Sequence, residues 1–186
     1  MGKLLKRTEA VFLCLSLVLG LALGIQAPTA KADAIEVKPY IAFGEDLKES
    51  EKKTVMKLLD VTEDELDDYE VIEVTNDEEH EYLDDYLASN VIGTRALSSV
   101  KIEETDAGEG IQVETKNINF CTEAMYVNAL ATAGFTDAYV TVAGPFELSG
   151  TAALVGAIKA YSVMTGEEVD EDAADAAMDE LVTTGG

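Results

Sequence analysis

The first 32 residues follow the three-part pattern of a secretory signal peptide, and this pattern decides which part of the chain folds. Lys3, Lys6 and Arg7 precede an apolar run from Ala10 to Ile25, and the triplet Ala30-Lys31-Ala32 follows. Small side chains at two alternate positions fit the shallow pockets of signal peptidase, so we expect cleavage directly after this triplet. The prediction is a protein that is secreted or associated with the cell envelope.

An uncleaved membrane anchor is the alternative interpretation of the leader. The uninterrupted apolar stretch falls short of the ~20 residues that a spanning helix needs, and the cleavage site follows it at once. We therefore expect no stable membrane anchor after cleavage. The mature part is predicted to be a single acidic domain over residues 33–182, followed by a disordered tail over residues 183–186.

The mature chain keeps a single cysteine, Cys121, because Cys14 lies inside the leader. One thiol cannot form an internal disulfide, so the hydrophobic core alone must hold the fold. A chain of about 150 residues is long enough for one such core. Cys121 lies near a predicted helix start, which favours a thiolate, but a small buried apolar role is the favoured interpretation.

The charge of the chain is strongly negative, with a formal net value of −24. Fourteen acidic residues and no lysine or arginine lie between Leu58 and Thr94. Like charge repels nucleic acid and anionic lipid, whereas a basic partner remains compatible. Calcium binding is the more specific functional interpretation of these acidic residues. The D-x-[DN]-x-[DN]-G loop is absent, so a solvated acidic face is favoured, and we predict no metal site and no cofactor.

The spacing of apolar residues predicts alternating strands and helices. The expected elements are a strand at 40–44, a helix at 50–59, a strand at 70–75, a helix from 76 to about 90, a hairpin at 96–117, a helix at 122–133, a strand at 138–143, a buried helix at 150–164 and an acidic helix at 171–182. The central order is the split βαβ order of ferredoxin-like folds. We predict an α+β fold with a mainly antiparallel sheet and helices packed on it.

Capping and breaking residues set the expected element ends. Gly144-Pro145 should end the strand before it, because proline cannot donate to a sheet. The expected helix N-caps, with a capping-box partner where the spacing provides one, are Ser50, Thr62 with Glu65, Asn76 with Glu79, and Ser149.

Several short motifs occur in a characteristic order between about residues 40 and 169. They are Val74-Thr75-Asn76, Ile92-Gly93-Thr94, Asn128-Ala129-Leu130-Ala131-Thr132-Ala133-Gly134, Gly144-Pro145-Phe146-Glu147-Leu148-Ser149-Gly150-Thr151-Ala152-Ala153-Leu154, and Lys159-Ala160-Tyr161. This pattern resembles the domain of unknown function 1002 family, the YpuA-like exported proteins of Gram-positive Firmicutes. The resemblance implies an extracytoplasmic protein and no particular reaction. It also implies relatives with more helix at the C-terminus, so this chain is expected to be a short member or a truncated piece.

Ser149 is the most obvious candidate nucleophile, since it follows a strand and precedes a helix. The surrounding residues are not G-x-S-x-G, and the only histidine in the chain is His80. We favour an N-cap role for Ser149 and assign no catalytic residue. His80 is interpreted as a solvated helix residue whose protonated form is favoured by the acids beside it.

Glycines and hydroxyl residues from two separate segments are the best candidates for a small polar pocket. A helix N-terminus and the segment before a strand can approach each other in such a fold. The predicted function is a non-enzymatic binding or interaction module, and the alternatives are a hydrolase using Ser149 and a low-affinity calcium-binding acidic protein. The predicted pocket residues are Gly93, Thr94, Ser98, Ser99, Ser149, Gly150 and Thr151.

Overall fold

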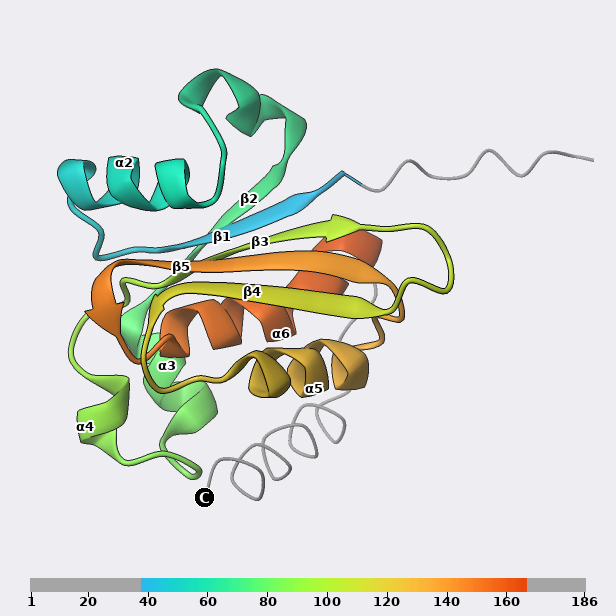
Figure 1. Cartoon of the computed structure of the whole chain (residues 1–186). Helices are drawn as coiled ribbons and strands as arrows, with labels where there is room; N and C mark the ends of the chain where they lie inside the picture. Colours follow the sequence, from blue (N-terminus) through green and yellow to red (C-terminus); the bar gives the residue numbers. More distant parts are fainter. Residues whose placement is uncertain (1–37, 167–186) are drawn as a thin grey trace, which may run out of the picture. The chain divides into compact units, whose positions relative to one another are not determined.

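Five strands form one mixed sheet in the order β2-β1-β3-β5-β4 (Figure 1). The computed structural model describes residues 38–166, so the predicted leader, last acidic helix and tail lie outside the described residues. The strands are β1 Tyr40–Gly44, β2 Glu70–Val74, β3 Ser99–Glu104, β4 Ile111–Ile118 and β5 Ala138–Leu148. The two outer pairs are parallel and the two inner pairs are antiparallel. The α+β class is confirmed, with a sheet that is mixed rather than mainly antiparallel.

The expected hairpin over residues 96–117 is wrong. Strands β3 and β4 follow one another in the chain, but β5 lies between them in the sheet. Val142 of β5 pairs with Val100 of β3, and Val140 pairs with Val113 of β4. The burial pattern explains this order, because β5 is buried along most of its first half whereas β4 alternates between half-buried and exposed residues. The more apolar strand takes the inner position. The predicted split βαβ order along the chain is present from β2 to β5, but the strand order in the sheet differs from that of a ferredoxin-like fold.

The helices cover both faces of the sheet, with α2 on one face and α3, α5 and α6 on the other (Figure 1). Val55, Met56 and Leu59 pack with Ile41 and Phe43 in a small core on the α2 side. The larger core lies on the opposite face and contains most of α6. The bounds are α2 Glu49–Leu58, the 3-10 helix η1 Glu63–Asp68, α3 Asn76–Leu83, α4 Ser89–Ile92, α5 Glu123–Ala133 and α6 Thr151–Thr165. None of the helices within residues 38–166 combines the length and the apolar character needed to cross a bilayer.

Helix α6 is buried along its first half, as its apolar sequence predicted. Gly156 faces β1 so closely that a Cβ atom there would lie 2.6 Å from the Cβ atom of Ala42. The hydroxyl of the buried Tyr40 donates a 2.9 Å hydrogen bond to the Gly156 carbonyl. The small residues of α6 therefore allow close packing of the helix on the sheet.

The predicted helix starts were right at η1 and displaced elsewhere. Thr62 and Glu65 form the expected capping box. The next box uses Thr75 and Glu78 rather than Asn76 and Glu79. Because the box begins one residue earlier than expected, Glu79 is not its N3 acceptor, and the Glu79 side chain is buried.

Two further predicted caps and one predicted break differ from the structure. Ser50 lies inside α2, whose N-cap is Lys48, and the N-cap of α6 is Gly150 rather than Ser149. Strand β5 continues past Gly144-Pro145 to Leu148. The register with β4 shifts there instead, and Asn117 donates its side-chain amide to the Gly144 carbonyl at 3.0 Å. Such an irregularity accommodates proline without ending the strand.

Candidate ligand-binding site

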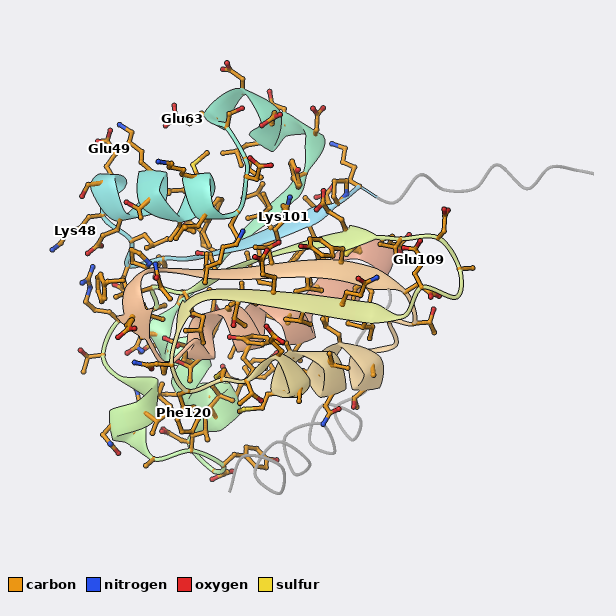
Figure 2. All side chains as sticks on the ribbon, viewed as in Figure 1. Lys48, Glu49, Glu63, Lys101, Glu109 and Phe120 are labelled. Carbon is orange, nitrogen blue, oxygen red and sulfur yellow. The ribbon has the colours of Figure 1, made fainter. Side chains whose placement is uncertain are left out.

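A pocket of about 450 Å³ opens between α4, the N-terminus of α6 and the segment that follows β4. Figure 2 shows Phe120 on this segment, close to α3 and α4 and on the side of the sheet opposite α2. The volume of this pocket is in the range of pockets that hold small molecules. The structure brings five of the seven predicted pocket residues together in its lining, namely Gly93, Thr94, Ser98, Ser149 and Thr151.

The other two predicted pocket residues have structural roles. Ser99 is fully buried in β3, and its hydroxyl accepts a hydrogen bond from the Gly44 amide at 3.3 Å. Gly150 has a φ of +95°, and its carbonyl accepts a hydrogen bond from the Tyr126 hydroxyl at 2.9 Å. Both residues hold the elements that frame the pocket, and neither belongs to its lining.

Glu79 is the pocket residue that sequence reasoning missed. It lies in α3, is only 1% exposed and lines the pocket. Its carboxylate accepts hydrogen bonds from the Thr151 hydroxyl at 2.6 Å and from the Asn76 amide at 3.0 Å. The helical spacing held a signal, because Glu79 stands three and four residues before Tyr82 and Leu83, on the apolar face of the helix.

Burial is the main influence on Glu79, and it raises the pKa of this carboxyl above the ordinary value. The hydrogen bonds from Thr151 and Asn76 act in the opposite direction, and so does the charge of nearby His80, whereas Asp46 adds to the rise. Desolvation opposes the charged form, and donors that point at the carboxylate favour it. The balance between the two forms of Glu79 therefore depends on the groups packed around its carboxyl.

The hydroxyl groups of Ser149 and Thr151 form a directed chain that ends on Glu79. The two hydroxyl oxygens lie 3.1 Å apart. When Glu79 is ionised it can only accept, so Thr151 donates its single proton to the carboxylate. Ser149 must then donate to Thr151. With its proton used in this way, Ser149 presents only lone pairs to the pocket.

Ser98 caps α6 from a neighbouring segment. The N-cap residue Gly150 has no side chain, and the buried Ser98 hydroxyl accepts a 2.8 Å hydrogen bond from the Ala153 amide in the first turn. The first amides of a helix have no intrahelical partner and need such an acceptor. Ser98 therefore fixes the position of α6 against the segment that leads into β3.

Ser98→Ala is expected to lower the free energy of unfolding by about 1–2 kcal/mol, the usual cost of losing a helix cap. Urea unfolding followed by circular dichroism measures this change. Ser50→Ala is the matched control, because Ser50 is exposed and lies within α2 rather than at its N-cap. The cap assignment fails if Ser98→Ala is no more destabilising than Ser50→Ala.

His80 links α3 to the pocket loop through both nitrogens of its ring. Nδ1 lies 2.8 Å from an Asp84 carboxylate oxygen, and Nε2 lies 3.1 Å from the carbonyl oxygen of Gly93. Both partners are acceptors, so a proton on each nitrogen satisfies both contacts. The hydrogen bond to Asp84 is the main cause of a raised pKa for His80, and the Gly93 carbonyl adds to it.

The His80 ring is expected to titrate above its ordinary pKa of 6.5. Because the folded-state pKa lies above the unfolded value, protonated His80 stabilises the fold. This stabilisation is complete below about pH 6.5 and is lost as the pH rises through the folded pKa. The chain has a single histidine, so proton NMR can follow its ring directly. Asp84→Asn should lower the measured pKa, whereas Glu81→Gln, on the same helix, should change it much less. A wild-type pKa at or below 6.5 would contradict the assigned geometry.

Ser149 and Cys121 lack the surroundings of reactive groups in this structure. The Ser149 hydroxyl bonds to Thr151, while both ring nitrogens of His80 bond to Asp84 and Gly93. Burial raises the pKa of the Cys121 thiol to about 12. A thiol with that pKa stays protonated at neutral pH.

Over residues 38–166, no group of three or more His, Cys, Asp or Glu side chains is placed to hold a metal ion. The acids of η1 are largely exposed, and Glu78 of α3 forms an ion pair with Lys159 of α6. The described acids thus contribute mainly solvent-exposed charge, with Glu79 as the buried exception.

The fold and the pocket define this molecule as an α+β protein that carries one mixed five-stranded sheet and a polar pocket at the N-terminus of its buried helix. The chain belongs to the family described as Protein of unknown function (DUF1002), which matches residues 43–186. It is 48% identical over 153 residues to the uncharacterized protein YpuA of Bacillus subtilis (strain 168). That alignment covers 82% of this chain and 51% of the relative, so the chain spans about half the length of the curated relative that it matches. No solved structure matches the chain.

Proposed function

We propose that this protein is exported and works outside the cytoplasm as a non-enzymatic binding protein, with the pocket above Glu79 as its ligand site. The observation that carries the proposal is that Ser149 and Thr151 from one segment and the buried Glu79 from another form a single hydrogen-bonded chain in the lining of one pocket. Such a set of polar groups in a partly apolar pocket is typical of small-molecule sites. The directed hydroxyl chain uses the Ser149 proton, which favours binding over nucleophilic catalysis.

Export is supported by the N-terminal leader with its Ala-x-Ala cleavage site. The test is expression of the full chain in a Gram-positive host, followed by N-terminal sequencing of the protein from the medium and the envelope. The expected first residue is Asp33. Recovery of the chain from the cytosol with its leader intact would contradict this part of the proposal.

The ligand site is tested on the purified exported protein by NMR with a library of small polar compounds. Compounds that bind are expected to shift the amide signals of residues 93–98 and 148–151. Phe120→Ala should weaken binding by removing an exposed apolar wall, since Phe120 is 40% exposed and lines the pocket. Phe146→Ala is the matched control, because Phe146 is 49% exposed on β5 and lies outside the pocket. Binders whose shifts map elsewhere, or equal effects of the two variants, would refute the site.

A further inference from the structure

The hydrogen bonds to the Glu79 carboxylate come from neutral donors, and nearby His80 adds charge but directs its two ring nitrogens to Asp84 and Gly93. The Glu79 residue is 1% exposed, and the two hydrogen bonds that its carboxylate accepts come from a hydroxyl and an amide. A carboxylate offers about four acceptor positions, so these two bonds leave capacity for a further donor. A buried carboxylate is stabilised most by a cation that also donates hydrogen bonds.

The second acceptor in the pocket is Ser149. Its hydroxyl proton is directed toward Thr151, so the lone pairs of its oxygen remain for a ligand. Glu79 and Ser149 are linked through Thr151 and line the same pocket. An incoming group therefore meets two acceptors that belong to one hydrogen-bonded chain, which favours a ligand group with several N–H donors.

The basic residue in the lining does not supply this cation. The Arg95 guanidinium donates to the Asp46 carbonyl and to the Glu51 carboxylate, both at 2.8 Å. Its charge is thus compensated by Glu51, outside the Glu79 chain. The net charge of −24 on the whole chain also attracts small cations and repels anions.

Apolar side chains complete the pocket. Phe120 and Leu148 line it together with Val91 and Leu97. An ammonium group on an aliphatic stem fits this combination, because the stem can pack on these side chains while the charged end reaches the acceptors.

We propose that the pocket selects a primary ammonium group on an aliphatic stem, with Glu79 and Ser149 accepting its hydrogen bonds. This inference rests on the proposed ligand site and adds the chemical class of the ligand. A neutral alcohol of the same length lacks the charge, and a quaternary ammonium of the same charge lacks the N–H donors. The pocket should discriminate against both.

The test titrates the purified exported protein with n-butylammonium, n-butanol and butyltrimethylammonium, followed by NMR of the amides of residues 93–98 and 148–151. Butylammonium should bind at least about tenfold more tightly than either analogue, as expected for a charge-assisted hydrogen bond. Glu79→Gln should abolish this preference. Glu81→Gln removes the same charge from an exposed position on the same helix and should leave it intact.

Ser149→Ala provides a second variant in case Glu79→Gln fails to fold, because Ser149 is half-buried and does not cap α6. It should weaken butylammonium severalfold without affecting butanol. Equal binding of all three probes, or an unchanged preference in a folded Glu79→Gln or Ser149→Ala protein, would overturn the ammonium assignment and leave the ligand site standing. If other library compounds bind at the pocket and butylammonium does not, the ammonium assignment is likewise overturned and the ligand site stands. If neither the library nor the probes shift these amides, the ligand site itself fails.

Discussion

Replacing Gly150 with alanine is expected to lower the free energy of unfolding by about 3 kcal/mol or more. Gly150 has a φ of +95°, a conformation that costs a non-glycine residue about 1–3 kcal/mol. The new Cβ atom would also lie 2.5 Å from the Tyr126 hydroxyl oxygen and 2.8 Å from a methyl carbon of Ile118. Overpacking of a core adds a further cost of about 1–3 kcal/mol. Both costs fall at the N-cap of α6, beside the pocket.

Urea unfolding followed by circular dichroism measures this loss, and Gly108→Ala separates the two causes. Gly108 has nearly the same φ, +98°, but no atom lies within 4 Å of the Cβ position. Its substitution should therefore cost only the conformational part, about 1 kcal/mol. Equal losses in the two variants would show that the contacts with Tyr126 and Ile118 do not contribute to the destabilisation.

Gly156→Ala is expected to destabilise the protein by a net amount of about 2 kcal/mol, although alanine favours helices by about 1 kcal/mol over glycine. The reason is the contact between α6 and β1, where the added Cβ atom would lie 2.6 Å from the Ala42 Cβ and 3.2 Å from a Val100 methyl. Non-bonded carbon atoms prefer separations near 3.5–4.0 Å, so the helix must move away from the sheet.

A double-mutant cycle with Ala42→Gly identifies this contact as the cause. Removing the Ala42 Cβ makes room for the new methyl group, so the double variant should be more stable than the sum of the single losses by at least about 1 kcal/mol. Unfolding in urea measures all four proteins. Additive losses would mean that the crowding at Ala42 does not limit the approach of α6.

Local patterns in the chain predicted most of the secondary structure. A short apolar segment ending in a glycine predicted β1, and alternation of apolar residues predicted β2. Apolar residues on nearly every face of α6 predicted a buried helix. Strand pairing was not predictable in this way, because β5 joins β3 and β4 through contacts between residues far apart in the sequence. A short apolar run carries no information about which neighbour it will find.

The pocket also combines residues that the sequence predicted with contacts that only the tertiary structure shows. Sequence reasoning placed Ser98, Ser149 and Thr151 near one another, yet it interpreted Ser149 as a helix cap. In the structure Ser98, which lies in another segment, caps the helix. The Ser149 hydroxyl bonds to Thr151 instead. Glu79 was missed because the capping-box rule assigned its side chain to the helix start. Glu78 makes that contact, one residue earlier.

The sequence by itself determined the α+β class, the chain order of the strands with the approximate start of each, and the strongly acidic composition, because these depend on local spacing and composition. Only the tertiary structure decided the strand order, the burial of Glu79 and the direction of the hydrogen bonds from Ser149 to the carboxylate. These features arise where α3 and α6 meet, and the energy of a buried charge depends on donors supplied from a residue 72 positions away in the chain. Local sequence carries no record of such a neighbour.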